Sequence, residues 1–560
     1  MPPDSFNLLD EPWLVVRGPG GETTRMSICQ TFKAAHQLTG LAGDLPTQEV
    51  ALLRLLLAIL YRALPVPATA EDRVEAWERW WKADELPAEL IDGYLEAHRD
   101  RFDLVHPAVP FMQVATLSAN KTSGLGKLIA DQPDGEQFFT TRAGVGLESI
   151  DLAEAARWLV HVHAYDPSGI KSGAHGDPRV KGGKGYPIGI GWAGWCGILL
   201  PQGRTLKDTL LLSLALNLDA LAGASRDEDR PVWERPPSTA APERGHEEPA
   251  GPADLLTWQS RRVRLVRSGD RVTDALISNG DPIHPRNRQR LEPHSAWRRS
   301  LAQEKQHGGT VYMPRSHDPE RALWRGLPGL LPQARPTGGG ASHEPAASLA
   351  PGVLEWIAEL VDSAALPATL PVQLRAVGVV YGSQSSTIAS ITEDGIRLRA
   401  AVFASEDLRS LLREMVASTE TAVAALRGLA GNLAEASGER DTTEGRRERA
   451  GEAAYAELDR LFPPWLDRLT PAADLDDLAR SWQDQVRSAL VRLGDDLVRS
   501  AGRPAWVGRS VGGPGSSRHL DSALAARWFR AGLAKALPAA TPAGLPPHPT
   551  DPIDDSEGED

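Results

Sequence analysis

Cysteine is scarce in this sequence, which excludes several classes of protein. Two cysteines occur in 560 residues, Cys29 and Cys196, and neither belongs to a CxxC pair. A disulfide-stabilised secreted scaffold and a cysteine-rich zinc site both need more cysteines at closer spacing. Isolated cysteines favour a reducing compartment, and we therefore expect a cytoplasmic protein.

Long apolar runs are also missing. The most apolar stretch, Val50–Leu60, contains eleven residues and includes Arg54, whereas a helix that crosses a bilayer needs about 20 apolar residues. The opening residues, MPPDSFNLLDEPW, are acidic and have no apolar core, so we expect no signal peptide. The sequence predicts no membrane partner, and Val50–Leu60 is typical of a buried helix.

A complete nucleotide-binding motif is missing as well, although glycine is dense in one stretch. Nine glycines occur between Asp166 and Gly194, a density that helices and strands do not tolerate. A phosphate-binding P-loop would need glycine where this chain has Pro178. Gly189–Gly194 fits G-x-G-x-x-G, but no clear strand precedes it and no helix follows, so the dinucleotide-binding context is absent.

What this stretch does contain is a set of cations. Lys171, Arg179, Lys181 and Lys184 are interleaved with the glycines. Exposed backbone N–H groups and cations together suit a polyanion such as nucleic acid. A solvated loop without a ligand is the alternative interpretation of the same residues.

The distribution of charge is more informative than its sum. The net charge is −13, which by itself does not favour nucleic acid. However, Leu256–Leu330 holds fourteen Arg and Lys against seven Asp and Glu, and the last ten residues hold six acids and no base. An acidic protein with one basic segment fits selective contact with a polyanion, whereas ordinary surface ion pairs would explain the same composition.

The hydrophobic patterns predict an α+β protein. A chain of 560 residues is too long for one hydrophobic core, so at least two domains are expected. Residues 1–400 are expected to form a large mixed α/β domain, with a helix over Leu206–Leu221 and a β-hairpin over Arg261–Ile277. Residues 401–540 are expected to form a four-helix bundle, with helices from Ser405 and near 443–462, 474–500 and 520–537. Residues 541–560 are proline-rich and acidic, which predicts a disordered tail.

One pair of histidines raises the question of a metal. His161 and His163 would share a face in a strand but diverge in a helix, and helical spacing is predicted here. No cluster of Cys or carboxylates completes a ligand set nearby. We therefore expect structural histidines and no metal site.

Several segments, taken together and in order, resemble one family. They are FNLLDEPWLVV at the start, FDLVHPAVPFMQV, the GIKSGAHGDPRVKGGKGYPIGIGW loop, EPHSAWRRS and TVYMPRSHDP. They are similar to the CasA family, the large subunit of the type I-E CRISPR Cascade surveillance complex. The resemblance runs from residue 6 to roughly residue 535.

The resemblance implies a subunit without catalysis or cofactor. Its function would be to recognise the protospacer-adjacent motif (PAM) in double-stranded DNA, help open the duplex for guide RNA pairing, and recruit the helicase–nuclease that degrades the target. Implied partners are target DNA, the 5′ end of the guide RNA, the other Cascade subunits and the helicase–nuclease. Base pairing with the guide would then supply sequence specificity beyond the PAM, as in other RNA-guided effectors.

The resemblance also implies roles for particular residues. A glycine loop that approaches the PAM through the minor groove matches Lys181, Gly182, Gly183, Lys184 and Gly185. The groove is only about 6 Å wide, so a backbone without side chains suits it. A lysine finger of the family falls in SAWRRS, so Arg298 or Arg299 is expected there, with Lys305 as a weaker alternative; either arginine would meet the negative potential of the groove.

Two further elements are implied in the same way. A glutamine wedge that inserts beneath the PAM matches Gln384, with Ser383 and Ser385 shaping its turn. Unstacking a base step costs a few kcal/mol, which such an insertion must offset. Phe138 and Phe139 fall in a loop that resembles a family loop contacting the guide RNA and the backbone of the complex.

Two other functions compete with this interpretation. A nucleotide-dependent enzyme using the glycine loop would need a complete phosphate motif and acid–base or metal residues around it. A purely structural assembly subunit would tolerate changes in the glycine loop and at Gln384 without loss of DNA recognition.

Overall fold

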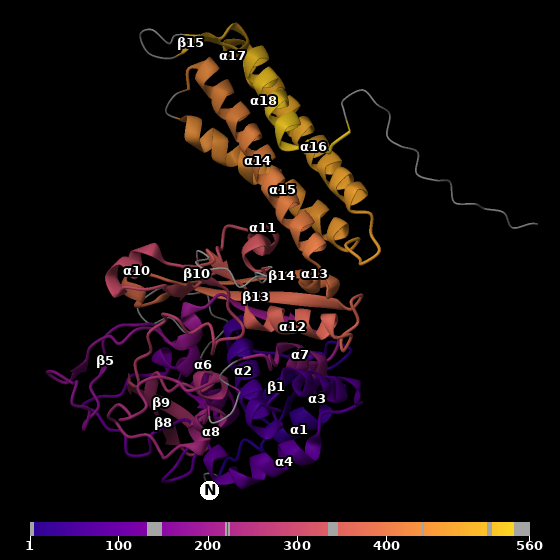
Figure 1. Ribbon diagram of the computed structural model, residues 1–560. Coiled ribbons are helices and arrows are strands. Elements are labelled where there is room, and N and C mark those ends of the chain that lie inside the picture. Colours follow the sequence, from indigo (N-terminus) through magenta and orange to yellow (C-terminus); the bar gives the residue numbers. More distant parts are fainter. Residues whose placement is uncertain are drawn as a thin grey trace, which may run out of the picture. The chain divides into compact units, whose positions relative to one another are not determined.

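The computed structural model describes residues 5–131, 148–218, 221, 225–333, 345–439, 442–511 and 518–541. The chain divides into two units, Met1–Glu406 and Asp407–Asp560 (Figure 1). The first mixes helices with small sheets and the second is largely helical, so the predicted α+β class is confirmed. No helix in the described parts of the chain is long and apolar enough to cross a bilayer. The predicted tail from residue 542 onward lies outside the described residues.

The helices of the first unit surround a core built on α2. They are α1 (Ile28–Ala34), α2 (Pro46–Ala63), α3 (Ala70–Lys82), α4 (Ala88–Ala97), α6 (Leu152–Tyr165), α7 (Leu206–Ser213), α8 (Ser225–Glu228), α9 (Pro252–Leu256), α10 (Leu301–His307), α11 (Leu323–Gly326), α12 (Gly352–Asp362) and α13 (Ala401–Ala404). Proline at the first position of α2 suits a helix start, because its missing N–H would have no partner there. The apolar run predicted to be a buried helix forms the middle of α2, buried on all sides.

A buried ion pair ties α2 to a segment far along the chain. Arg54 Nη2 lies 2.7 Å from Glu292 Oε2, and both side chains are at most 3% exposed. Trp192 Nε1 also donates to Glu292 Oε2, at 2.6 Å. Glu292 therefore joins α2 to the end of the glycine-rich stretch, and its partners explain how an arginine is accommodated inside an apolar helix.

The strands of the first unit form small antiparallel sheets. They are β1 (Leu14–Arg17), β2 (Thr23–Met26), β3 (Gly40–Leu41), β4 (Ile150–Asp151), β5 (Lys171–Ser172), β6 (Lys184–Gly185), β7 (Ile198–Gln202), β8 (Arg261–Ser268), β9 (Arg271–Asn279), β10 (Trp297–Arg299), β11 (Tyr312–Pro314), β12 (Ser348–Leu349), β13 (Pro371–Tyr381) and β14 (Ile388–Arg399). The strand orders are β2-β1-β3, β4-β9-β8, β14-β13-β7, β11-β10-β12 and β5-β6. The predicted hairpin over Arg261–Ile277 is confirmed as β8 and β9, with Gly269 at its turn.

The helix predicted over Leu206–Leu221 is shorter than expected. It ends at Ser213, although the following residues are just as apolar. Tertiary partners take the backbone carbonyls at this end: Trp77 Nε1 donates to Leu211 O at 2.9 Å, and the Tyr61 hydroxyl donates to Ala215 O at 3.2 Å. Side chains from other helices thus replace the helical hydrogen bonds, which the periodicity of this segment could not reveal.

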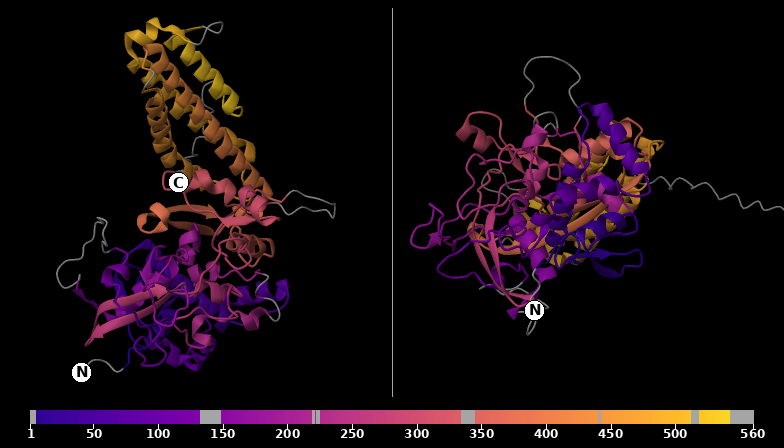
Figure 2. Two further views of the ribbon diagram at one scale, coloured as in Figure 1. Left: turned by 90° about the vertical axis from the view of Figure 1, so that its left-hand side faces the viewer. Right: turned by 90° about the horizontal axis from the view of Figure 1, so that it is seen from below.

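The second unit contains the four predicted helices, which run side by side in two views (Figures 1 and 2). Its elements are α14 (Glu406–Ser437), α15 (Thr443–Leu466), α16 (Leu475–Ser500), α17 (Gly502–Val507), β15 (Arg509–Val511), β16 (Arg518–Leu520) and α18 (Ser522–Ala536). Aromatic rings of Phe462, Trp465 and Trp482 pack with centroids 5.1–5.4 Å apart, and Trp482 Nε1 donates to Thr419 Oγ1 at 2.9 Å. This cluster joins α14, α15 and α16.

The second bundle helix, α15, ends later than the sequence predicted. The spacing predicted a helix near 443–462 that stops before Pro463–Pro464, but α15 continues through both prolines to Leu466. The prolines occupy the last turn, where burial of Trp465 and Leu466 holds the chain in helical conformation. Packing of these side chains outweighs the loss of backbone donors at a helix end.

Candidate nucleic-acid interface

The glycine-rich stretch is folded into a hairpin rather than a loose loop. Strand β5 pairs with β6 in antiparallel register, with Lys171 opposite Gly185. At the tip, Lys181 and Lys184 exchange both backbone hydrogen bonds at 3.1 Å. The two residues between them, Gly182 and Gly183, have φ of 59° and 72°. Positive φ at both central residues is the requirement of the tightest hairpin turns, which glycine meets without strain.

The space around the turn differs from one glycine to the next. A Cβ on Gly182 would have no atom of the described residues within 4 Å other than those of its chain neighbours, whereas one on Gly183 would lie 3.2 Å from Asn120 Nδ2. A Cβ on Gly185 would lie 3.0 Å from Asn279 Nδ2. Gly183 and Gly185 therefore have neighbours inside the protein, while Gly182 faces open space. Lys181 and Lys184, on either side of the turn, are both exposed.

A buried cluster of charges holds the base of this hairpin. The Asp166 carboxylate lies 2.5 Å from Lys171 Nζ and also accepts a hydrogen bond from Arg261 Nε. Arg261 Nη2 donates to the carbonyl oxygens of Pro167 at 3.0 Å and Gly189 at 2.8 Å. One guanidinium thus joins the two ends of the glycine-rich stretch, because Pro167 lies before the hairpin and Gly189 lies after it.

The ionisation of this cluster follows from its burial. Burial lowers the pKa of Lys171 to about 8 and outweighs the opposing attraction of Asp166. Burial alone would raise the pKa of Asp166, but the charges of Lys171 and Arg261 hold that pKa below its usual value. At neutral pH the cluster therefore contains one carboxylate between two cations, and the position of β5 depends on that arrangement.

Strand β9 supports the outer part of the same hairpin. Asn279 Nδ2 donates to Tyr186 O at 2.6 Å, and Ser278 Oγ donates to Ser172 O at 2.7 Å. Arg179, one of the interleaved cations, is bound to Asp177 and to the carbonyl of Gly280 at 2.9 Å. Figure 1 shows β5 on the same side of the first unit as β8 and β9. Arg179 therefore serves the loop itself, which leaves Lys181 and Lys184 as the cations at its tip.

The residues before Gly124 also contribute to this site, although no sequence motif predicts them. Ala119 bridges Ala174, and His175 N donates to Ser118 O at 2.8 Å. Asn120 Oδ1 lies 3.1 Å from His175 Nε2. Residues 118–124 thus pack along the glycine hairpin from about 50 residues upstream. No local motif marks them, and pairing between distant segments is what a single sequence does not display.

The predicted wedge lies at the turn between β13 and β14. Gln384 is exposed and has φ 54° and ψ 21°, and Ser385 also has positive φ, at 53°. Two consecutive non-glycine residues in left-handed conformation cost about 1–2 kcal/mol each. Gly382 N donates to Thr387 O at 3.0 Å and closes the turn. Ser385 N also donates to Gly382 O at 2.9 Å and Ser386 Oγ donates to Ser383 O at 2.8 Å, so internal hydrogen bonds hold the Gln384 amide at the tip of a long hairpin despite this cost.

The wedge turn and the glycine hairpin meet on one side of the first unit. A cavity of about 300 Å³ is lined by Pro167–Lys171 from one and Ser386–Ile388 from the other. A Cβ on Gly169 would lie 3.9 Å from Ser386 Cβ. The Tyr381 hydroxyl donates to Tyr165 O at 2.7 Å and anchors the end of β13 beside the start of the glycine-rich stretch. The structure thus brings two of the predicted elements together.

The two candidate finger arginines have different environments. Both lie on β10, in the β11-β10-β12 sheet. Arg299 Nε lies 2.8 Å from Glu304 Oε1, and Arg299 Nη1 donates to Pro345 O at 3.3 Å. Arg298 is exposed and has no ion pair with another described residue, and Lys305 on α10 is exposed as well. No contact between described residues joins either arginine to the glycine turn or to Gln384.

His161 and His163 are buried structural residues, as predicted. Both lie on α6, where His161 Nε2 is 3.0 Å from Thr47 Oγ1 and His163 Nε2 donates to Met112 O at 2.9 Å. Burial lowers the pKa of each to about 4. The described residues contain no group of His, Cys, Asp and Glu that could hold a metal ion.

The G-x-G-x-x-G sequence serves packing. Gly191 lies against the backbone of Ala164, and Gly194 lies against the Tyr381 ring, so a Cβ at either position would collide. A short 3-10 helix, Trp192–Trp195, and then strand β7 follow the motif, where a dinucleotide site would need a long helix. This agrees with the sequence-based argument against a dinucleotide motif.

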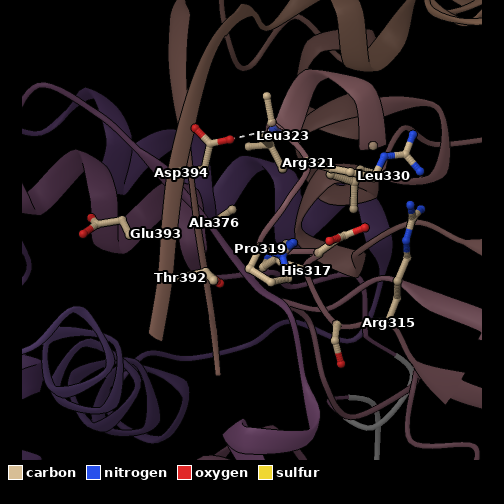
Figure 3. A pocket seen from close by; sticks show the side chains of 14 residues that line it. Arg315, His317, Pro319, Arg321, Leu323, Leu330, Ala376, Thr392, Glu393 and Asp394 are labelled. Atoms are coloured by element: carbon tan, nitrogen blue, oxygen red, sulfur yellow. Dashed lines mark hydrogen bonds between the residues drawn. The ribbon is translucent and has the colours of Figure 1, made fainter. Parts of the chain in front are cut away.

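A further cavity lies beside the stem of the wedge hairpin, β13 and β14. It encloses about 290 Å³ between the segment after β11 and strands β13 and β14 (Figure 3). Asp394 accepts a hydrogen bond from Leu323 N at 2.6 Å, and Glu393 points to the other side of the strand (Figure 3). His317 Nε2 donates to Ile198 O at 3.1 Å, and burial lowers its pKa. None of the predicted site residues lines this cavity.

Phe138 and Phe139, predicted to contact the guide RNA and the backbone of the complex, lie outside the described residues.

Comparison with known families gives one consistent match. The family described as CRISPR-associated protein Cse1 matches residues 7–493. A curated protein of Thermus thermophilus, CRISPR-associated protein CasA/Cse1, is 31% identical over 335 residues, which make up 59% of this chain and 61% of that protein. The match thus spans less than two thirds of that relative's length.

Solved structures of the same fold cover nearly the whole chain. Cse1 of Thermobifida fusca matches with a TM-score of 0.85 and 43% identity, over 96% of this chain and 99% of that one. Cse1 from Acidimicrobium ferrooxidans matches with a TM-score of 0.77 and 29% identity, over the same shares. A chain of a CRISPR RNA-guided surveillance complex shares the fold, with a TM-score of 0.64 at 22% identity over 88% of this chain and 100% of that one.

Proposed function

Because the chain belongs to the Cse1 family of CRISPR-associated proteins, we propose that it is the large, non-catalytic subunit of a type I-E RNA-guided complex. In that complex it recognises the PAM in double-stranded DNA from the minor groove and helps to open the duplex for guide RNA pairing. It then recruits the helicase–nuclease. Its further partners are the 5′ end of the guide RNA and the other subunits of the complex. The shared fold with a chain of a surveillance complex supports this assignment.

The observation that carries the proposal is the open space around Gly182. A turn of two glycines, with an exposed lysine on each side and no described residue beyond its chain neighbours within 4 Å of a Cβ on Gly182, presents bare backbone outward. The minor groove is only about 6 Å wide, so a glycine tip without side chains can approach its floor more closely than a turn that carries them. Backbone N–H groups can then donate to the acceptors on the groove floor, while the lysines meet the phosphates.

Gln384 supplies the second step. Its side chain stands exposed at a turn whose backbone is held in the left-handed region. Strain of this kind persists where the surrounding structure fixes it, and it is concentrated at functional sites. The amide can hydrogen-bond base edges while it occupies the space of a displaced pair, which offsets part of the few kcal/mol of unstacking. Ser383 and Ser385 shape the turn.

Arg298 is the better candidate for the minor-groove finger. Arg299 is engaged by Glu304 on α10 and by the carbonyl of Pro345, and moving it into a groove would break those contacts. Arg298 is exposed on the same strand. Its guanidinium can enter a narrow groove without leaving an unpaired carboxylate behind.

The proposal is tested with the complex reconstituted on a guide RNA. Two target duplexes are compared, one with a PAM selected from a randomised flank and one with that flank scrambled, each with a fluorescent base analogue at the first pair beyond the PAM. Wild type should bind the first duplex more tightly and open it. Gln384→Ala should bind it within a few-fold of wild type but open it at least tenfold more slowly.

Equal binding of both duplexes by wild type would refute PAM recognition. Unchanged opening of the duplex by Gln384→Ala would refute the wedge. If both of these negative results are obtained with a complex that still assembles, the chain is a structural assembly subunit.

A further inference from the structure

The last two glycines of the G-x-G-x-x-G sequence form a socket at the end of α6. A Cβ on Gly191 would lie 2.5 Å from the carbonyl oxygen of Ala164 and 2.6 Å from Tyr165 N, so glycine lets the chain rest on the helix end. A Cβ on Gly194 would collide with the hydroxyl oxygen of Tyr381, on β13. The two positions therefore keep room for the backbone of α6 and for one side chain of the wedge hairpin.

The side chain in this socket is Tyr381. Its hydroxyl donates to the backbone carbonyl of Tyr165 at 2.7 Å. Burial raises the pKa of that hydroxyl well above its usual range, so it stays protonated and remains a donor at neutral pH. The register with β14 shifts between Val380 and Tyr381, and such a bulge redirects the side chain beside it. The strand is therefore irregular at the residue that enters the socket.

The hydrogen bond in the socket joins the two elements predicted to contact DNA. In the described parts of the chain it is the one hydrogen bond between residues 381–388, which form the wedge turn, and residues 165–194, which form the glycine hairpin and its ends. Asp166, the residue after Tyr165, belongs to the ion cluster beneath β5. The base of one element is thereby tied to the base of the other.

The position of the wedge must be set to within one base step. Successive base pairs of DNA are about 3.4 Å apart, so a displacement of that size would move the Gln384 amide from the first gap beneath the PAM into the next one. The turn is closed by its own hydrogen bond, Gly382 N to Thr387 O at 3.0 Å, which fixes its shape but not its place. An anchor at the base of the turn is what fixes where Gln384 enters the duplex.

We propose that Tyr381, seated against Gly194 and bonded to the carbonyl of Tyr165, is the positioning residue that sets the register of the wedge and holds Gln384 at the base step adjoining the PAM. The inference rests on the proposed function and concerns a residue that acts through Gln384 rather than on DNA itself. Because Tyr381 contacts the base of the turn and not the groove, its loss affects opening of the duplex and leaves recognition of the PAM in place.

Removing the hydroxyl removes the anchor and little else. Tyr381→Phe keeps the ring against Gly194 but leaves the buried carbonyl of Tyr165 without its donor. An unmade hydrogen bond at a buried group corresponds to a factor of about 5 to 150 in an equilibrium constant. We expect opening of the duplex to slow by about tenfold, because the wedge then spends part of its time away from the productive position.

The test uses the reconstituted complex and the PAM duplex with the fluorescent base analogue at its first pair. Tyr381→Phe should bind this duplex within about threefold of wild type, keep the preference over the scrambled duplex, and open it about tenfold more slowly. The double variant Tyr381→Phe with Gln384→Ala should open it at the rate of Gln384→Ala alone, because the hydroxyl acts through the glutamine. Gly194→Ala, which places a methyl group against the hydroxyl oxygen, should slow opening as well.

Tyr61→Phe is the matched control. The Tyr61 hydroxyl also donates to a buried backbone carbonyl, that of Ala215 at 3.2 Å, elsewhere in the first unit. This variant loses the same kind of hydrogen bond and should open DNA like wild type. If it slows opening as much as Tyr381→Phe does, general destabilisation explains the effect and the anchor is refuted.

Three further results would overturn the proposal. The first is wild-type opening by Tyr381→Phe. The second is slowing that multiplies in the double variant, which would mean an effect independent of Gln384. The third is loss of PAM preference in Tyr381→Phe, which would assign the residue to the glycine hairpin. Failure of the proposed function is a separate result, because it appears as equal binding of the two duplexes by wild type or as unchanged opening by Gln384→Ala.

Discussion

Replacing Gly182 with asparagine tests whether glycine is needed there for folding of the turn or for its contact with DNA. Asparagine tolerates the left-handed conformation better than other side chains do, so φ of 59° costs it well under about 1 kcal/mol. Apart from the two chain neighbours, no atom of the described residues lies within 4 Å of the added Cβ. The free energy of unfolding should therefore change by less than about 0.5 kcal/mol, as is usual for surface substitutions.

The effect on DNA binding should be much larger. A groove of about 6 Å admits the bare tip of the turn but has little room for an added amide side chain. If the turn withdraws and two backbone hydrogen bonds to base edges are lost, at about 1–1.5 kcal/mol each, binding weakens by 2–3 kcal/mol. That is a loss of about 30- to 150-fold for PAM-containing DNA, with little change for the scrambled duplex.

The assay is equilibrium binding of both duplexes by the reconstituted complex, with urea unfolding of the isolated chain alongside. Gly269→Asn is the matched control, because Gly269 has φ of 68°, open space around its Cβ and a place at another hairpin turn. Gly269→Asn should bind like wild type. Full PAM-dependent binding by Gly182→Asn would refute the groove-entry argument, and equal losses in both variants would trace the effect to turn chemistry instead.

The remaining predictions concern stability and the other site residues. Between about pH 6.5 and pH 4, His161 and His163 bind protons in the unfolded chain but remain neutral in the folded one. The free energy of unfolding should therefore decrease as the pH falls through this window, by on the order of 3 kcal/mol per histidine. His163→Gln keeps a donor for Met112 O and should give a shallower pH dependence of urea unfolding; an unchanged slope would contradict this. Gln384→Gly should raise the unfolding free energy by about 1 kcal/mol by removing left-handed strain, and a decrease would show that the strain argument is wrong. Arg298→Gln should weaken DNA binding about fivefold at 150 mM salt and leave stability unchanged, whereas Arg299→Gln should leave DNA binding intact, and the reverse order would reassign the finger.

The long elements were predictable because their patterns are local. Helices α14 and α16 follow helical spacing over more than 20 residues, and the β8–β9 hairpin is marked by alternation around Gly269. The failures lie where distant side chains replace backbone partners. Helix α7 ends at Ser213 because Trp77 and Tyr61 take the carbonyls beyond Thr209, and nothing in Leu206–Leu221 itself signals that.

In the candidate site, too, the features formed by adjacent residues were predicted and those formed by distant residues were missed. Glycine density and the YGSQSST turn identified the two tips, because turn chemistry is written in adjacent residues. The ion cluster beneath the hairpin was missed, since Arg261 and Asp166 are 95 positions apart. So was the companion segment at 118–124, whose role depends entirely on pairing with residues about 50 positions later.

The most direct test of minor-groove PAM recognition changes the DNA rather than the protein. The reconstituted complex is given PAM duplexes whose purines carry either major-groove changes, as in 7-deaza analogues, or minor-groove changes, as in inosine or 2,6-diaminopurine pairs. Only the latter alter the groups that a turn in the minor groove would contact. Binding should be indifferent to 7-deaza substitution and should weaken at least tenfold with minor-groove changes. Sensitivity to the major-groove analogues alone would contradict the account.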